Sequence, residues 1–190
     1  MNSQEIIEIY KKHSALMTGH FLLSSGLHSD TYLQSELVMQ YPFIAKALME
    51  ELAKKIYIYD FSTILSPAIG GIRVGYELAR TLNKRAIFLE RVDGKMSLRR
   101  GFNISKNEKI VIMEDVLTTG KSTIETIEVA KSLGAEIVLV SALIDRSERD
   151  IDFNAPLIPL VKFKVITYGA SDCQLCKEGL PLVTPGSRHV

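Results

Sequence analysis

Short runs rich in β-branched residues alternate with segments of helical apolar spacing from Phe61 onward. These runs are apolar on both faces, and most are followed by a helical segment, which is typical of a parallel sheet with helices on both sides. We therefore expect an α/β domain with a doubly wound, mostly parallel sheet. The expected strands are residues 63–65, 86–89, 110–113 and 137–143, and the expected helices are residues 72–82 and 120–133.

The N-terminal third begins with a helical apolar pattern over residues 3–17. A second helix is expected after Pro42, which suits a helix start, because apolar residues recur four positions apart up to Ile56. Between these helices, residues 21–34 are polar and aromatic. Residues 91–105 break the later alternation, because they contain two glycines and too few apolar residues for a buried element. This last segment predicts a long loop.

Length and charge limit the kind of partner. The 190 residues and the hydrophobic content of 46% suit one globular domain with its own core. The formal net charge of +1 argues against nucleic acid or an anionic membrane as the main partner, so any anion must be bound locally. No apolar run approaches the roughly 20 residues of a membrane span, and the N-terminus lacks a signal-peptide pattern. We expect a cytoplasmic protein.

The two cysteines, Cys173 and Cys176, form a CxxC pattern near the C-terminus. A redox pair would open a helix after a strand, which this pattern does not indicate. A zinc site would need two more ligands, whereas only His189 lies downstream. We therefore expect two reduced thiols, with a metal or redox role as the alternative.

Residues 109–123, with the sequence KIVIMEDVLTTGKST, combine an apolar strand, two acids and a Thr/Gly-rich turn. The end of this segment looks like a P-loop, but that motif requires a glycine five residues before Gly120, where the chain has Asp115. A carboxylate is not expected in a backbone nest that holds a polyphosphate. The P-loop interpretation is therefore rejected.

The same segment suits a different anion. Small hydroxyl residues and a glycine at a strand-to-helix junction expose backbone N–H groups that can hold one phosphate dianion. Glu114 and Asp115 precede this turn, and their carboxylates can accept hydrogen bonds from vicinal sugar hydroxyls. The segment therefore predicts a site for a ribose 5-phosphate group. The alternative is an ordinary capped helix after an acidic turn, because Thr and Ser cap helices in many proteins.

The segment resembles the fingerprint of the type I phosphoribosyltransferases, in which an apolar strand, two acids and a Thr/Gly-rich loop bind 5-phosphoribosyl 1-diphosphate (PRPP). The resemblance implies that Glu114 and Asp115 hold the ribose hydroxyls and that the 5-phosphate lies among the residues that follow. The implied PRPP-binding residues after the two acids are Val116, Leu117, Thr118, Thr119, Gly120, Lys121 and Ser122.

Three further segments, residues 19–34, 66–79 and 173–188, resemble the orotate branch of that family. The first and third imply a small hood over the base site, formed by about residues 1–35 and 160–190. The second resembles the pyrophosphate loop, a glycine-containing turn whose backbone amides can approach a pyrophosphate. The implied PRPP-binding residues of this loop are Ala68, Ile69, Gly70 and Gly71.

The base is expected to meet Arg146, which follows the last expected strand at the carboxyl edge of the sheet, where ligands gather. A guanidinium can hold a carboxylate with two hydrogen bonds, and the resemblance implies that Arg146 and Thr118 contact orotate. Tyr32 is the candidate to cover the base. The alternatives are a solvated arginine and a core tyrosine. Two lysines that familiar members carry near Ser24 and Gly70 are absent, which leaves those anion contacts open.

Displacement of pyrophosphate builds positive charge on the ribose and negative charge on the leaving group. Orotate supplies its own ring nitrogen as nucleophile, so no strong protein base is required. Mg²⁺, held mainly by ligand oxygens with no firm protein ligand, is expected to neutralise the leaving group. Lys95 is the candidate for the main catalytic residue, assisted by Arg91, Arg99 and Arg100. We expect their segment, residues 91–105, to be a flexible lid that closes over pyrophosphate, with a solvated basic loop as the alternative.

The resemblance as a whole implies transfer of the phosphoribosyl group from PRPP to orotate in pyrimidine biosynthesis, giving orotidine 5'-phosphate and diphosphate. It also implies a homodimer in which the lid reaches the neighbouring site. One alternative is an enzyme of the same fold that acts on a purine or on uracil. The other is a non-catalytic regulator that binds PRPP, which should carry a basic face or a DNA-binding segment. The sequence has neither.

Overall fold

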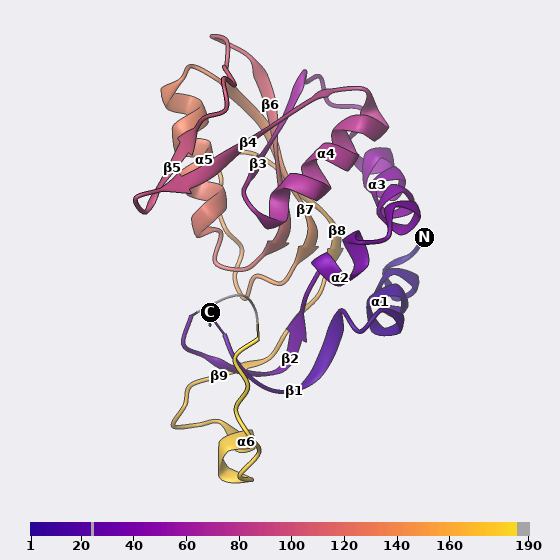
Figure 1. Ribbon diagram of the computed structural model, residues 1–190, viewed down its shortest axis with the longest axis vertical. Coiled ribbons are helices and arrows are strands. Elements are labelled where there is room, and N and C mark those ends of the chain that lie inside the picture. The colour runs from indigo at the N-terminus through magenta and orange to yellow at the C-terminus, as the bar shows by residue number, and fades with distance from the viewer. Residues whose placement is uncertain (24, 186–190) are drawn as a thin grey trace.

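A six-stranded sheet with the strand order β5-β4-β3-β6-β7-β8 is the centre of the computed structural model, which describes residues 1–23 and 25–185 (Figure 1). Each neighbouring pair of these strands is parallel except β4 and β5. The mostly parallel sheet expected from the sequence is therefore confirmed. Its strands are β3 (Thr63–Pro67), β4 (Arg85–Val92), β5 (Lys95–Leu98), β6 (Lys109–Leu117), β7 (Glu136–Asp145) and β8 (Leu157–Lys162).

Helices cover both faces of this sheet. The helices α3 (Pro42–Ile56) and α4 (Gly70–Leu82) lie on one face, and α5 (Lys121–Ser132) lies on the other (Figure 1). Two separate groups of buried apolar side chains fill the two interfaces, one including Leu48 and Leu78 and the other including Ile127. Burial on both sides explains why the central strands are apolar on both faces, and it confirms the doubly wound α/β architecture.

A second, antiparallel sheet of three strands joins the two ends of the chain. Its order is β1-β2-β9, and it lies beside the carboxyl ends of the central strands (Figure 1). In residues 1–23 and 25–185, no helix is both long enough and apolar enough to cross a membrane. The remaining elements are β1 (Leu16–Leu22), β2 (His28–Leu33), β9 (Thr167–Tyr168), α1 (Ser3–Lys12), α2 (Glu36–Met39) and α6 (Gln174–Lys177).

The first helix is shorter than the predicted residues 3–17. It begins with a capping box, in which the side chains of Asn2 and Glu5 bond to each other's backbone, and it ends at Lys12. Ser14 has a positive φ of 54°, a conformation that a right-handed helix cannot continue through. The next apolar residues therefore belong to β1, because a short apolar run fits a strand as well as a helix.

The prediction of a long loop over residues 91–105 is wrong for its first half. β4 continues to Val92 and pairs with β5 through a two-residue turn, Asp93 and Gly94. Both turn residues have positive φ, 48° and 80°, as a type I′ hairpin turn requires, and Asp-Gly is a preferred sequence for that turn. The hairpin exists because this local turn signal outweighs the low apolar content of the segment.

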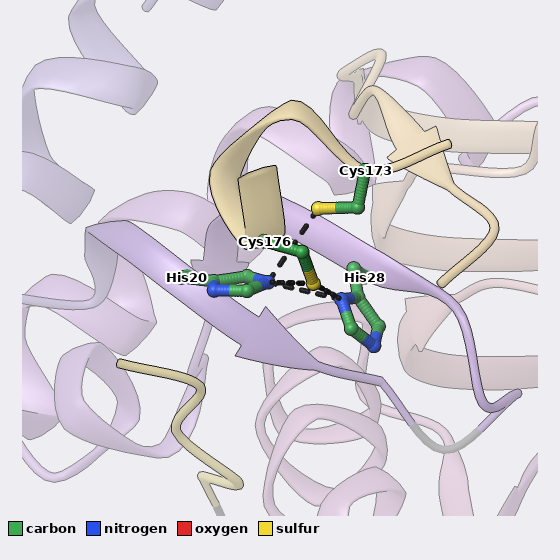
Figure 2. Close-up of side chains that lie close together, drawn as sticks. All are labelled: His20, His28, Cys173 and Cys176. Carbon is green, nitrogen blue, oxygen red and sulfur yellow. Dashed lines mark hydrogen bonds between the residues drawn. The ribbon is translucent and has the colours of Figure 1, made fainter. Parts of the chain in front are cut away.

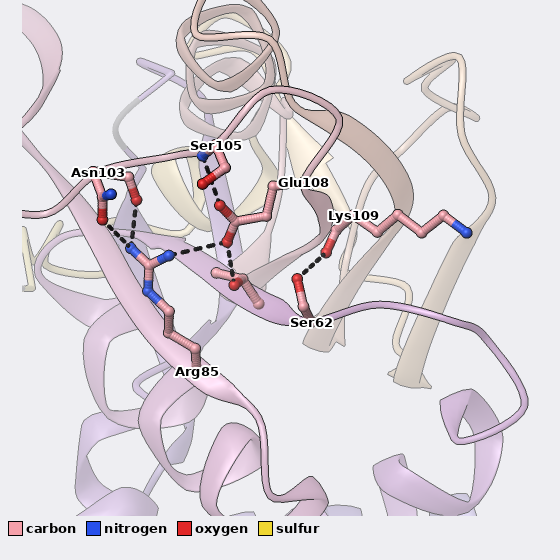
Figure 3. A network of polar contacts seen from close by, with 7 residues as sticks. Ser62, Arg85, Asn103, Ser105, Glu108 and Lys109 are labelled. Carbon is pink, nitrogen blue, oxygen red and sulfur yellow. Dashed lines mark hydrogen bonds and ion pairs between the residues drawn. The ribbon is translucent and has the colours of Figure 1, made fainter.

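A polar network at the amino end of the sheet fixes the chain that follows the hairpin (Figure 3). The guanidinium of Arg85 donates to Oε1 of Glu108 at 3.1 Å and also to the carbonyl oxygen of Asn103. The backbone N–H of Ser105 donates to Oε2 of Glu108 at 2.8 Å. Residues 103–105 are therefore anchored, so that any movement of the basic segment is confined to the residues before them.

Candidate active site

The sheet reverses its winding between β3 and β6, because β3 is followed by β4 on one side whereas β6 is followed by β7 on the other. In open parallel sheets ligands bind outside the carboxyl ends of the strands at such a switch point. A cleft of about 1130 Å³ opens at the carboxyl ends of β6 and β7. Its lining comes from both sheets and comprises Leu23, Ser25, Leu27, Arg91, Gly94, Glu114, Val116, Leu117, Thr118, Thr119, Gly120, Lys121, Ser122, Thr123, Arg146, Glu148, Arg149, Asp150, Ile151, Asp152, Val165 and Thr167.

Glu114 lines this cleft from the end of β6. Burial, together with the neighbouring charge of Asp115, raises the pKa of Glu114 well above its ordinary value, although the Thr123 hydroxyl lowers it. Its Oε2 is buried and has no hydrogen-bond partner among the residues that the structure describes. A buried carboxyl oxygen without a donor is a binding group for a ligand hydroxyl.

Asp115 does not line the cleft but points to the turn after β3, because neighbouring residues of a strand face opposite sides. A Cβ placed on Gly70 would lie 2.3 Å from Oδ2 of Asp115, so the carboxylate occupies the space that a side chain would need. Burial raises the pKa of Asp115, which the backbone N–H of Val116 lowers. The two acids therefore connect the predicted ribose site to the predicted pyrophosphate loop.

The turn from β6 into α5 has the form expected of a phosphate site. Gly120 caps α5 with a φ of 74°, and a Cβ there would lie 3.0 Å from Ile151. Glycine meets both requirements, because it tolerates positive φ and occupies no side-chain space. The first backbone N–H groups of α5, which begins at Lys121, have no partners within the helix, and the first three residues of the helix line the cleft.

Arg146 lines the cleft directly after β7, where its backbone N–H donates to the carbonyl oxygen of Leu117 at 2.9 Å. Burial lowers the pKa of Arg146, and nearby Tyr32 partly offsets this effect. The Nε atom is buried and has no acceptor within residues 1–23 and 25–185. A buried guanidinium nitrogen without an acceptor points to an anionic ligand, and this disfavours the solvated surface arginine.

Other predicted site residues lie outside the lining of the cleft. Tyr32 packs against Phe21, with ring centroids 5.7 Å apart, and it is half-buried. The predicted pyrophosphate-loop residues form the turn from β3 into α4, where Ile69 is 82% exposed and the Ala68–Ile69 peptide bond is cis. The structure brings this turn to Asp115 through Gly70, and its contact with pyrophosphate stays a prediction.

The four predicted cations lie on or next to the β4–β5 hairpin, and only Arg91 lines the cleft. Arg91 pairs with Glu125 and donates to the carbonyl oxygen of Gly94 at 2.6 Å. Arg100 makes two hydrogen bonds to Glu90, at 2.9 and 3.0 Å, and Arg99 lies 3.7 Å from the same carboxylate. Lys95 is exposed and forms no ion pair in the described part of the chain. The catalytic roles of these cations stay predictions.

Part of the cleft wall was not predicted from the sequence. Thr123, at the start of α5, contributes to the pKa of Glu114, and residues 148–152 line the cleft after Arg146. A polar run directly after a buried parallel strand was the available signal, because loops at the carboxyl edge of such a sheet carry ligand contacts. The contributions of Leu23 and Thr167 depend on the second sheet, and no local pattern reveals that pairing.

A family described as phosphoribosyl transferase domain matches residues 38–166 of the chain. The fold agrees with this match. The crystal structure of orotate phosphoribosyltransferase from Aeropyrum pernix has a TM-score of 0.72 and 22% sequence identity, covering 83% of this chain and 93% of that one. An adenine phosphoribosyltransferase from Thermoanaerobacter pseudethanolicus also superposes, with a TM-score of 0.60 over 70% of this chain. The fold and the cleft therefore define a phosphoribosyltransferase, but not its base.

Full-length relatives are more specific. The chain is 49% identical to an orotate phosphoribosyltransferase of Caldanaerobacter subterraneus subsp. tengcongensis over 190 residues, which is 100% of both chains. It is 46% identical, again over 100% of both chains, to an orotate phosphoribosyltransferase of Desulforamulus reducens. This chain belongs to the orotate phosphoribosyltransferase family, as the resemblance in its sequence indicated.

Proposed function

We propose that this chain transfers the 5-phosphoribosyl group from PRPP to orotate, giving orotidine 5'-phosphate and diphosphate. Membership of the family supports this activity. The observation that carries it is a pair of buried groups in the lining of one cleft that have no partner among the described residues: Oε2 of Glu114 needs a donor and Nε of Arg146 needs an acceptor. A ribose hydroxyl satisfies the first and the carboxylate of orotate satisfies the second.

The remaining parts of the substrates, the 5-phosphate and the base, are assigned to other residues of the same cleft. We propose that the N–H groups at the start of α5, with the hydroxyls of Thr119 and Ser122, surround the 5-phosphate; all of these residues line the cleft. Thr118 and Arg146 both line the cleft, and the hydroxyl of Thr118 is the proposed partner of the base. The second sheet forms a hood over the base, with Tyr32 at its edge toward Arg146. In this proposal the anomeric carbon lies between Glu114 and the base.

Breaking the bond to diphosphate leaves positive charge on the ribose, which Glu114 stabilises from the cleft, whereas Asp115 acts from beside the turn at Gly70. Negative charge collects on the departing diphosphate, beside the turn at Gly70 and the cations of the β4–β5 hairpin. Lys95 is the main cation for this group, with Arg91, Arg99 and Arg100 assisting. The ring nitrogen of orotate attacks without a protein base, because orotate is itself electron-rich at that position.

Magnesium fits this cleft as an ion carried by its substrate. Among the described residues, the one group of three or more His, Cys, Asp or Glu side chains close enough to hold a metal lies outside the cleft. Mg²⁺ accepts few protein ligands when phosphate oxygens are present, and Glu114 would offer it a carboxylate from the lining of the cleft. The bound ion neutralises charge on the diphosphate oxygens.

We also propose a cytoplasmic homodimer in which the hairpin serves a neighbouring site. The two free cysteines fit a reducing compartment, where disulfides are rare. Large apolar side chains stay exposed around α3 and α4, including Phe43, Ile69 and Tyr76, and they fit a contact between copies. Light scattering measures the mass in solution, and a mass of one chain at assay concentration would refute the dimer.

The activity is tested by following the absorbance of orotate with PRPP, with and without Mg²⁺. Orotate is consumed only when PRPP and a divalent metal are both present, whereas uracil, adenine and hypoxanthine are not. Arg146→Gln removes a charge-assisted contact of about 1.5–3 kcal/mol, so the KM for orotate rises by about ten- to a hundredfold. The control Arg80→Gln changes an exposed arginine of α4 that pairs with Glu77. Equal use of orotate and uracil by the unmodified chain would refute the proposal.

A further inference from the structure

Two histidines of the second sheet and the two cysteines of the C-terminal segment point their side chains at one another (Figure 2). His20 lies on β1, His28 lies on β2, and Cys173 and Cys176 come from the first turn of α6. One ligand atom from each of the four side chains lies within 4.8 Å of every other. Three of the four residues are buried. The group is separate from the catalytic cleft, since none of its members lines it.

The distances within the group approach those of a tetrahedral ion site. The Nε2 atom of His20 lies 2.9 Å from Nδ1 of His28, 3.5 Å from Sγ of Cys173 and 3.6 Å from Sγ of Cys176. Sγ of Cys176 lies 3.2 Å from Nδ1 of His28. Bonds of about 2.0–2.3 Å from zinc to nitrogen and sulfur place tetrahedral ligands about 3.3–3.8 Å apart. The group therefore needs to move only slightly to hold such an ion.

A hydrogen bond outside the group prepares His20 as a ligand. Its Nδ1 lies 2.9 Å from the carbonyl oxygen of Leu180, which can only accept, so Nδ1 carries the proton. In the neutral ring Nε2 then keeps its lone pair, and that atom faces the other three side chains. Histidines that bind metals are commonly fixed by this kind of bond from the second ring nitrogen.

Hydrogen bonds alone do not satisfy the group. Nδ1 of His28 and the two sulfur atoms all approach Nε2 of His20, which has one lone pair and accepts one proton. A cation at the centre would use all four atoms at once. With both thiols deprotonated, two thiolates balance the charge of a divalent ion, which suits a group of mostly buried residues.

We propose that His20, His28, Cys173 and Cys176 bind a structural Zn²⁺ ion. Two sulfurs and two imidazole nitrogens in tetrahedral arrangement select zinc among the common biological cations, and four protein ligands leave no open position for catalysis. The two thiol protons leave to solvent on binding. The partners of the CxxC pair, sought downstream in the sequence, are supplied from more than 140 positions upstream.

The ion holds the C-terminal segment against the hood. Near it the two segments are also joined by a short backbone contact: Val183 donates to the carbonyl oxygen of His20 at 2.8 Å and accepts from Leu22 at 2.9 Å. Leu23, Ser25 and Leu27, which lie between the two histidines in the sequence, line the cleft. Zinc therefore positions one wall of the substrate cleft, in addition to closing the chain into a large loop.

The test measures metal content. Untagged protein purified without chelator is analysed by plasma mass spectrometry, and about one zinc per chain is expected. Cys173→Ser and His28→Ala should each lower this content severalfold, whereas the control His13→Ala, a histidine that packs on Tyr41, should not. Wild-type protein loaded with Co²⁺ should show the visible spectrum of a tetrahedral thiolate site, a readout that needs no variant. No zinc in the wild type and no cobalt spectrum would overturn the proposal.

The redox alternative gives a different result. Because the chain has two cysteines, a disulfide between them makes the intact protein lighter by two hydrogen atoms and leaves no titratable thiol. The zinc site predicts two thiols that react slowly until a strong chelator removes the metal. A disulfide in protein purified under air and unaffected by added zinc would refute the metal site.

The effect of zinc on the substrate cleft is measured separately, and this part of the inference rests on the proposed function. In assays with excess Mg²⁺, Cys173→Ser should raise the KM for orotate by severalfold with a smaller change in kcat, because the hood wall shifts while the catalytic groups stay. An unchanged KM in zinc-free protein would remove the link to the cleft. The metal content decides the site itself, whether or not the protein acts on orotate.

Discussion

Replacing Glu114 by Gln should make the ligand-free protein more stable and the enzyme less active. Oε2 of Glu114 is buried and unpartnered within the described residues, and the second acid, Asp115, adds repulsion. A buried polar group without a partner costs about 1–3 kcal/mol, and more when it is charged. Removing the charge should therefore stabilise the fold by about 1–3 kcal/mol, or about 2–12 °C in Tm for a chain of this size.

The stability gain should depend on pH in a defined direction. The pKa of Glu114 is raised in the folded protein, so below the ordinary glutamate pKa the group is protonated in both states and costs nothing. As pH rises above that value, only the unfolded chain ionises, and the fold loses stability until the raised pKa is passed. The difference between Glu114→Gln and wild type should thus be small at pH 4 and largest at neutral to alkaline pH.

The activity should change in the opposite direction. A carboxylate that accepts from ribose hydroxyls contributes about 1.5–3 kcal/mol per charged hydrogen bond, so kcat/KM for PRPP should fall by about ten- to a hundredfold. Thermal unfolding without ligand at several pH values, together with steady-state kinetics, measures both effects. A variant that is less stable than wild type at pH 8, or one that keeps kcat/KM within about twofold, would refute the reasoning.

Four further substitutions, the last one combined with the third, test other parts of the structure. Lys95→Ala should lower kcat at least tenfold, equivalent to about 1.4 kcal/mol, and a change within about twofold would exclude it as the main catalytic residue. Gly120→Ala should cost more than about 1 kcal/mol in unfolding free energy, because φ is 74° and Phe153 and Ile151 fill the space; an unchanged Tm would contradict this. Gly75→Ala should destabilise by about 1–3 kcal/mol, because its Cβ would lie 2.1 Å from Oγ of Ser66. Ser66→Ala removes the clashing hydroxyl, which is buried and unpartnered in the described chain. The double variant should therefore lose less stability than the sum of the two single variants, and additive losses would argue against a clash between Gly75→Ala and Ser66.

The centre of the fold and of the site was predictable because its signals are local. The strand, the two acids and the Thr/Gly-rich turn of residues 109–123 lie in one continuous segment, and the structure has β6 and α5 there. Arg146 could be placed for the same reason, since it directly follows a buried strand. β8 was missed because Pro159 interrupts its pattern, yet β8 is an edge strand, where a missing N–H is tolerated.

Long-range pairings could not be predicted in the same way. The CxxC pair indicated half of a possible site, but nothing in the spacing of His20 and His28 connects them to residues more than 140 positions away. These histidines meet the cysteines because β2 pairs with β9, five residues before Cys173. That pairing is a property of the folded hood, and a two-residue strand such as β9 carries too little pattern to be recognised in a sequence.

The β4–β5 hairpin lowers the entropic cost of closing a lid over diphosphate. Ordering a structureless loop costs about 1–2 kcal/mol per residue, whereas the β4–β5 pairing already fixes residues 92–98 and Glu108 anchors residue 105. The contacts of Arg91, Arg99 and Arg100 with diphosphate also contribute less free energy than new ion pairs would. Each arginine must first give up its ion pair with Glu125 or Glu90. These exposed ion pairs are weak, so the exchange is easy but yields little. Lys95 has no such partner in the described chain, and its contact with diphosphate is therefore a net gain, which is the physical reason to assign it the main role.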